Sequence, residues 1–134
     1  MVERIESKRL DSFEGVVKSV EFETSELGED NRTQRQYHIK IDPTNVVVGG
    51  ATHLIHEWIR LSPKATEMAV QFGSVIDRYL THVEIVVPEA KGMKTVEESL
   101  KTMIGKKFRF NKLKLGREFE GQPAKDYWVP VARL

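Results

Sequence analysis

The apolar residues of this chain change their spacing twice, and this change limits the folds that the chain can adopt. Between residues 34 and 42 they alternate with polar ones, so that Tyr37, Ile39 and Ile41 face one side of a predicted strand. Between residues 72 and 83 they recur at helical spacing, and toward the C-terminus the alternation returns. The sequence therefore predicts a run of strands, an amphipathic helix and a second run of strands.

Three strands are expected before the helix, over residues 12–24, 34–42 and 51–61. In the first of these, the apolar positions change parity between Val17 and Val20, which indicates a β-bulge and a bend. Pro43 ends the second strand, and Gly49-Gly50 predicts a hairpin turn before the third.

The central helix is predicted over residues 75–85, where Ser74 and Asp77 resemble a capping box. Its apolar stripe consists of Phe72, Val75, Ile76, Tyr79, Leu80 and Val83. A shorter helix is predicted over 96–103, with Thr95 and Glu98 in the capping positions.

Two strands are expected to finish the chain, over residues 106–115 and 127–133, with a second bulge between Phe110 and Leu113. The order β-β-β-α-β-β is that of the five-stranded OB barrel, so the fold class expected is a mainly β barrel with one helix. Residues 1–134 are expected to form a single domain, of which 1–11 form a flexible N-terminal segment. A two-layer α+β sheet has the same element order and stays as the alternative.

Composition excludes several functional classes. The chain has no cysteine, which excludes disulfides and thiolate zinc sites. It shows neither a signal peptide nor an apolar run of membrane-spanning length, so we expect a cytoplasmic protein that does not bind membranes. The formal net charge is only +1, which is not the bulk charge of a strongly basic nucleic-acid binder.

The distribution of charge is more informative than its sum. Residues 1–30 carry nine acidic and four basic side chains, whereas residues 106–117 carry six basic side chains and no acidic one. A local positive field is therefore possible on a nearly neutral molecule. The alternative is that these lysines only keep an exposed strand soluble.

Three segments carry a resemblance to a known family. They are the opening Phe13-Glu-Gly-Val-Val17, the strand Gln36-Tyr-His-Ile-Lys-Ile-Asp42, and the closing Gly105-Lys-Lys-Phe-Arg-Phe110 with Trp128-Val-Pro-Val131. They are similar to phage-type and archaeal OB-fold proteins that bind single-stranded DNA. The resemblance implies a sequence-tolerant binder without enzymatic activity or cofactor, which acts in replication, recombination or repair.

Single-stranded nucleic acid is held by cations that contact phosphates and by exposed rings that stack on bases. The polar face of the second and third strands offers both groups, in Gln36, His38, Lys40, His56, Trp58 and Arg60. Trp58 is the most informative of these, since an indole on a polar face is exposed unless something stacks on it. Packing beneath the 46–52 hairpin or at a dimer contact is the competing interpretation. Further phosphate contacts are expected from Lys107, Arg109, Lys112, Lys114 and Arg117.

Catalytic and metal signals are weak. His53 and His56 lie three residues apart, so on a strand they face opposite sides and cannot chelate one ion together. We find neither a nucleophile elbow nor a phosphate-binding glycine loop. Glu57 on the apolar face of its strand is unusual, and pairing with a base is the simplest explanation. We therefore expect no catalytic residue and no metal site.

Two other functions stay open. One is a protein-interaction or structural module on the same fold, with an apolar patch at Val46, Val47 and Val48 through which the chain forms a homo-oligomer. The other is an RNA-binding OB domain, which the sequence does not distinguish from a DNA-binding one.

Overall fold

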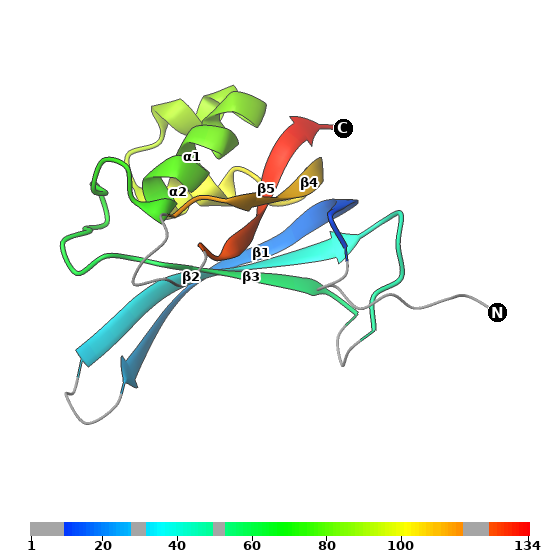
Figure 1. Cartoon of the computed structure of the whole chain (residues 1–134). Coiled ribbons are helices and arrows are strands. Elements are labelled where there is room, and N and C mark those ends of the chain that lie inside the picture. The colour runs from blue at the N-terminus through cyan, green and yellow to red at the C-terminus, as the bar shows by residue number, and fades with distance from the viewer. Residues whose placement is uncertain (1–9, 28–31, 50–52, 117–123) are drawn as a thin grey trace.

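The computed structural model describes residues 10–27, 32–49, 53–116 and 124–134. They form one antiparallel sheet of five strands, with the helices on one side of its first three strands (Figure 1). The strands are β1 (Ser12–Leu27), β2 (Arg32–Pro43), β3 (Ile55–Arg60), β4 (Lys107–Lys114) and β5 (Asp126–Arg133). The prediction of a mainly β chain is confirmed.

Two helices and a short 3-10 turn connect β3 to β4. Helix α1 (Val75–Val86) begins at Ser74, whose hydroxyl accepts the N–H of Asp77 at 3.3 Å. The turn η2 (Pro88–Gly92) follows, and α2 (Val96–Lys101) begins at Thr95, whose hydroxyl accepts the N–H of Glu98 at 3.1 Å. Both predicted helix starts are confirmed, because each cap satisfies a backbone donor that the first turn leaves unpaired.

Two expectations in this region are wrong. Phe72 was assigned to the buried stripe of the helix, but it precedes the N-cap and is fully exposed. The third strand begins at Ile55 and not at residue 51, because His53 has a φ of 55°, a left-handed conformation that cannot continue a strand. The predicted Gly49-Gly50 turn falls largely on residues 50–52, which lie outside the described residues.

The sheet has the strand order β3-β2-β1-β4-β5, with β1 at its centre. Within the described residues β3 and β5 form the two edges and no ladder joins them, so the sheet is not closed by strand pairing. Closure by strand pairing, which the expectation of a barrel required, is not found. The side chain of Glu57 in β3 nevertheless reaches across this gap and accepts the backbone N–H of Trp128 in β5.

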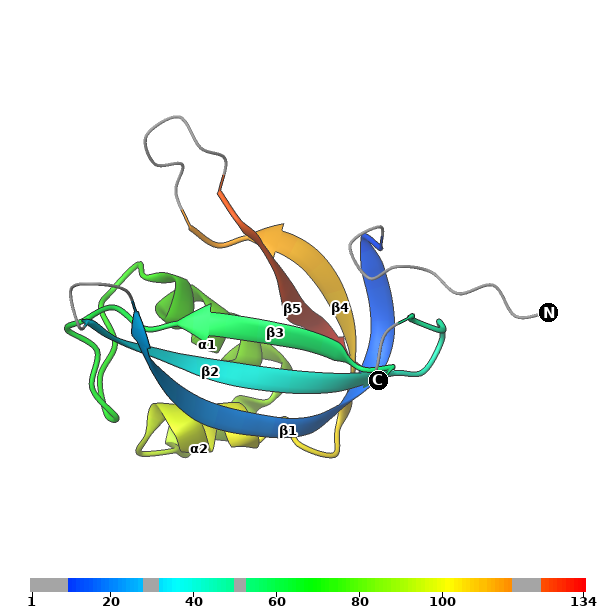
Figure 2. The ribbon, with the colours of Figure 1, turned by 90° about the horizontal axis from the view of Figure 1, so that it is seen from below.

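β1 is long and strongly curved (Figure 2). Its pairing with β2 passes from Val17–Ile41 to Ser19–Lys40, which leaves Lys18 as an extra residue. This is the bulge that the change of parity predicted, and it bends the strand. Gly15 is required near the bend, because a Cβ there would lie 2.8 Å from a methyl carbon of Ile41 and 2.9 Å from the carbonyl oxygen of Asp42.

The second bulge is not where it was predicted. β4 pairs with β5 without interruption from Phe110 to Lys114, so no bulge separates Phe110 from Leu113. The register shifts instead between Arg109 and Phe110, whose partners are Ala132 and Pro130. The extra residue is therefore Val131 in β5, where Pro130 cannot donate a backbone hydrogen bond to a regular ladder.

The core lies between the sheet and the helices. Phe13, Phe108 and Phe110 are at most 1% exposed, and Tyr79 of α1 and Leu100 of α2 are completely buried beside them. Each large apolar side chain buried in this way contributes about 1.5–3 kcal/mol relative to an exposed position. No helix formed by the described residues lies over the outer face of β1, β2 and β3, and this face turns toward the viewer in Figure 2.

The N-terminal expectation is partly corrected. Residues 1–9 lie outside the described residues, but Leu10 is buried and the carbonyl of Asp11 accepts the N–H of Lys112 at 3.0 Å. Residues 10 and 11 are therefore part of the folded domain. Among the described residues, no helix has the length and apolar character needed to cross a membrane.

Candidate functional site

Six of the predicted binding residues lie together on the outer face of β2 and β3. The register places Gln36 opposite Arg60, His38 opposite Trp58, and Lys40 opposite His56. Directly paired residues of an antiparallel ladder point to the same side, and residues two apart in a strand do so as well. The structure therefore brings this set into one patch, which we call the outer-face cluster.

Trp58 is the exposed aromatic residue of this cluster. Its indole is 40% exposed and stacks on the rings of His38 and His56, with centroids 4.5 Å and 5.5 Å away. The two imidazole centroids are only 5.0 Å apart. Rings on opposite faces of the indole would lie farther from each other than from the indole, so both imidazoles lie toward one side of it. Neither of them covers the second face of the indole.

His38 is the buried residue of the cluster and contacts its neighbours through both ring nitrogens. Although it lies on the polar face, it is only 7% exposed, and both of its ring nitrogens have partners. Nδ1 lies 3.1 Å from Oε2 of Glu23, and Nε2 lies 2.8 Å from Nδ1 of His56. Burial first, and then the charges of His38 and Lys40, hold the pKa of His56 below its ordinary value. His38 is thus a supporting residue rather than an accessible one.

Sequence reasoning missed two glutamates of β1 that belong to this face. Glu21 is the register partner of His38, and Glu23 is the partner of Gln36, whose amide donates to Oε1 of Glu23 at 3.0 Å. Burial alone would raise the pKa of Glu23, but hydrogen bonds from Gln36, His38 and Trp58 and the charge of His38 together lower the pKa. The alternation of Glu21 and Glu23 with Val20 and Phe22 was the available signal.

The cations of the cluster differ in how firmly they are held. Lys40 lies 3.5 Å from Oε1 of Glu21, an exposed pair that contributes little to stability. Arg60 is exposed, and in the amide orientation that satisfies both groups the oxygen of Gln34 accepts from its guanidinium. Both side chains can turn toward an anionic ligand at small cost, since their present partners are exposed or uncharged.

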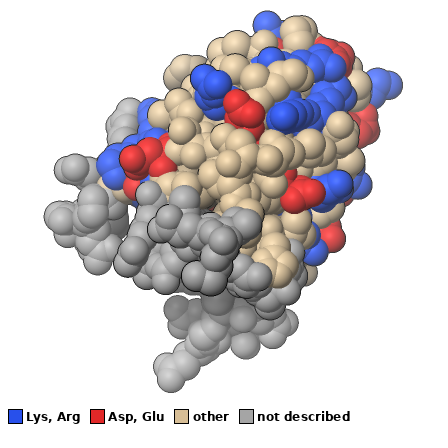
Figure 3. All heavy atoms as spheres, turned by 90° about the vertical axis from the view of Figure 1, so that its right-hand side faces the viewer, with Lys and Arg blue, Asp and Glu red and all other residues tan. Residues whose placement is uncertain are grey.

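The basic residues of β4 do not join this cluster. Lys107 and Arg109 lie 4.0 Å and 3.4 Å from the carboxylate of Glu14, and Lys114 lies 3.0 Å from that of Asp126. Figure 3 shows basic side chains interspersed with acidic ones on the face toward the C-terminus. Lys112 extends over the ring of Trp128, 5.2 Å from its centroid. Arg117 lies outside the described residues.

Glu57 connects the outer-face cluster with the far edge of the sheet. Its carboxyl is buried and accepts the backbone N–H groups of Trp58, at 3.1 Å, and of Trp128. Burial raises the pKa of Glu57 to about 7, although these two donors and the charge of Lys125 act in the opposite direction. The base expected to pair with it is replaced by two backbone donors.

Comparison with known proteins does not assign the chain to a family. No family model, no curated protein and no solved structure matches it.

Proposed function

We propose that this chain is an OB-fold protein that binds single-stranded DNA without sequence specificity, in replication, recombination or repair. The observation that carries the proposal is the exposed indole of Trp58, which stacks on two imidazoles on an uncovered sheet face. A rigidly held ring with one accessible face can stack on a base of any sequence, and such stacking contributes about 1–3 kcal/mol.

The strand order supports the OB assignment. In that fold the first strand is central and pairs with the second and the fourth, the barrel is partly open, and the second and third strands carry the oligonucleotide contacts. The order β3-β2-β1-β4-β5 is compatible with this arrangement, and Glu57 bridges the two strands that a closed barrel would pair. The outer-face cluster lies on the strands that the fold uses for binding.

The cluster also suggests a division of roles. Trp58 stacks on a base, and Lys40 and Arg60 on either side of it contact phosphates. Gln36, His38 and His56 position the indole and the flanking charges. The β4 cations contribute less than their number suggests, because Glu14 and Asp126 neutralise three of them. This arrangement limits the phosphate contacts to a few and predicts a moderate salt dependence.

The proposal is tested by fluorescence anisotropy of labelled oligo-dT, titrated with protein at two salt concentrations. Trp58→Ala is expected to weaken binding about 5- to 150-fold, which is the equivalent of the stacking energy. Trp58→Phe, which keeps a ring, is expected to retain most of the affinity. Phe72→Ala is the control variant, because it removes a fully exposed aromatic ring outside the cluster.

Two results would contradict the proposal. One is the absence of saturable binding at low salt. The other is an equal affinity of Trp58→Ala and the unmodified chain. Repeating the titration with oligo-U distinguishes DNA from RNA, since a preference for oligo-U favours the RNA-binding alternative.

The protein-interaction alternative has less support from the described residues. The three valines of its predicted patch do not form a contiguous exposed surface. Val48 is only 2% exposed and Val46 packs against the core, so that Val47, which is 41% exposed, is the accessible residue of the three. A concentration-dependent mass in solution together with no binding to oligo-dT would favour this alternative.

A further inference from the structure

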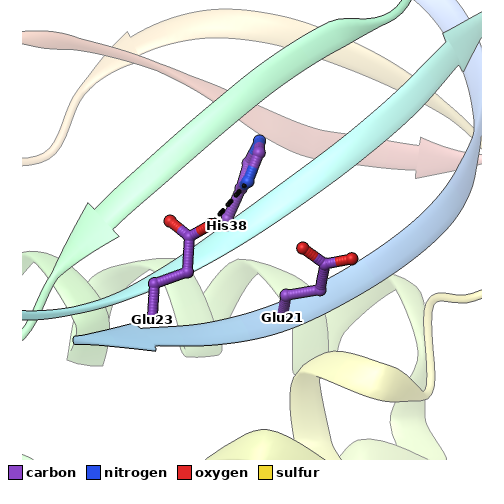
Figure 4. Close-up of side chains that lie close together, drawn as sticks. All are labelled: Glu21, Glu23 and His38. Carbon is purple, nitrogen blue, oxygen red and sulfur yellow. Dashed lines mark hydrogen bonds and ion pairs between the residues drawn. The ribbon is translucent and has the colours of Figure 1, made fainter.

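The ligand atoms of two carboxylates and one imidazole converge on the outer face of β1 and β2. One oxygen each of Glu21 and Glu23 and one ring nitrogen of His38 lie within 4.8 Å of one another (Figure 4). An ion with bonds of about 2.1 Å would require ligand atoms about 3.4 Å apart in tetrahedral geometry. Small rotations of glutamate side chains close this difference, and the side chain of Glu21 is 49% exposed and therefore able to move.

The backbone places these three groups without strain. Glu21 and Glu23 are two apart in β1 and so point to the same side, and His38 is the direct register partner of Glu21. The side chains thus approach from two hydrogen-bonded strands of a regular ladder. Ligands on adjacent strands are held more precisely than ligands on loops.

The imidazole is already oriented as a metal ligand would be. His38 is more than nine-tenths buried, its Nε2 lies 2.8 Å from Nδ1 of His56, and its Nδ1 lies 3.1 Å from Oε2 of Glu23, so Nδ1 points toward the glutamates while Nε2–H can donate to His56. Histidine ligands in metal sites generally donate their second ring N–H to a neighbouring acceptor, which fixes the tautomer and the ring orientation. An ion bound at Nδ1 would take the place of the present contact between Nδ1 and Glu23.

We propose that Glu21, Glu23 and His38 bind one divalent transition-metal ion of the Zn²⁺ or Mn²⁺ class. Imidazole selects for transition ions, and two carboxylates supply the negative charge that balances a divalent cation. Three protein ligands leave at least one coordination position for water or another oxygen ligand. The ammonium group of Lys40 lies 3.5 Å from the carboxylate of Glu21. A bound ion must either displace this ammonium group or share the carboxylate with it.

One consequence rests on the proposed function. Glu21 and Glu23 lie on the same sheet face as Trp58, which would contact phosphates, and they repel an anionic strand. A bound ion would neutralise them, and a phosphate oxygen is a suitable ligand for its remaining coordination position. Oligo-dT binding is then expected to be stronger with the ion than after chelation.

The metal site is tested first in the absence of nucleic acid, by calorimetric titration of the full chain with Zn²⁺ and with Mn²⁺. We expect one ion per chain, and at least a tenfold loss of affinity in Glu21→Gln and in Glu23→Gln, which keep the side-chain shape. Glu14→Gln is the matched control, since Glu14 lies in β1 but pairs with Lys107 and Arg109 outside the cluster. Its affinity for the ion is expected to be unchanged.

A second measurement locates the ion. Paramagnetic Mn²⁺ bound at Nδ1 of His38 would lie close to Trp58, whose ring centroid is 4.5 Å from that of His38. In an NMR spectrum of the indole N–H groups, assigned with Trp58→Phe, the Trp58 signal is expected to broaden before that of Trp128. Broadening of neither signal, or equal Zn²⁺ affinity in the Glu21→Gln/Glu23→Gln double variant, would overturn the site.

The two proposals fail separately. Metal binding with no affinity for oligo-dT would contradict the proposed function and leave the ion site intact. Binding of oligo-dT that is the same with Zn²⁺ and with chelator, together with no ion in the calorimeter, would overturn the metal proposal and leave the Trp58 interface.

Discussion

The two tryptophans of the chain occupy contrasting positions in the structure. Both lie on edge strands of one sheet, and both have a nearby cation or imidazole. Trp58 of β3 is 40% exposed, whereas Trp128 of β5 is 7% exposed and meets the edge of Phe13, with centroids 4.9 Å apart.

The difference comes from what covers each strand. α1 packs over β5, and the hydroxyl of its Tyr79 donates to the carbonyl of Trp128 at 2.8 Å. No described element covers the outer face of β3. The same residue type therefore stabilises the core at one edge of the sheet and is available to a ligand at the other. The following experiments separate these two roles.

The largest expected difference is in stability. Trp128→Ala should lower the free energy of unfolding by about 3–5 kcal/mol, because it leaves a cavity beside Phe13. Trp58→Ala should cost about 1 kcal/mol or less, since the ring is partly exposed. Urea denaturation of both variants measures these values. Similar losses in the two variants would show that the Trp58 ring is a core element and would weaken its assignment to binding.

The carboxyl of Glu57 accepts the backbone N–H groups of both tryptophans, and its ionisation should make the stability of the fold depend on pH. Its pKa is raised from 4.5 to about 7 by burial, so between these values the folded protein keeps a proton that the unfolded chain releases. The free energy of unfolding should therefore fall as the pH rises through this interval, by on the order of 3 kcal/mol, and stay level with respect to this group above it.

The measurement compares urea midpoints of the unmodified chain and Glu57→Gln between pH 4.5 and pH 8. The amide cannot ionise, so the variant should lose this component of the pH profile while other groups titrate as before. Parallel profiles for the two proteins would mean that Glu57 does not carry the effect.

A smaller effect is expected at the contact between α1 and β5. Tyr79→Phe removes the donor to the carbonyl of Trp128 and leaves a buried acceptor without its partner. The expected loss is about 1–2 kcal/mol of unfolding free energy, with no change in oligo-dT affinity. If this variant loses binding at unchanged stability, then α1 and the outer face are coupled, and the separation of the two roles fails.

The smallest expected effect concerns the cations. Lys40→Gln should reduce the slope of log affinity against log salt by roughly 0.7, the value for one phosphate contact of a single strand. Lys114→Gln should leave the slope nearly unchanged, because Asp126 at 3.0 Å already neutralises that ammonium group. Anisotropy titrations over a series of salt concentrations compare the two, and a larger change in Lys114→Gln would move the interface to β4.

Local patterns were sufficient to predict much of this fold. The alternation in β2 and β3 assigned the inner and outer faces correctly, because one residue of displacement would have exposed Tyr37, Ile39 and Ile41. The helix starts followed from Ser74 and Thr95, whose caps involve only neighbouring residues. The bulge in β1 was visible as a change of parity within one strand.

The features that could not be predicted depend on partners distant in sequence. Arg109 is neutralised by Glu14, 95 residues away, so β4 appeared more basic than its surface is. Glu21 meets His38 only because of the register between β1 and β2. Phe72 is a different case, because the local cap at Ser74 already places it before the helix although it follows the helical spacing, and it is exposed.

Because of the extra residue Lys18, the curvature of β1 and the side of the sheet that each of its residues faces are determined separately. Val17 and Val20 face the core on either side of it, so a chain that lacked Lys18 would keep each of the other side chains on its present side. Only the bend would be lost. Sheet curvature in this protein is thus adjustable by a one-residue change in length, independently of which amino acids form the inside and the outside.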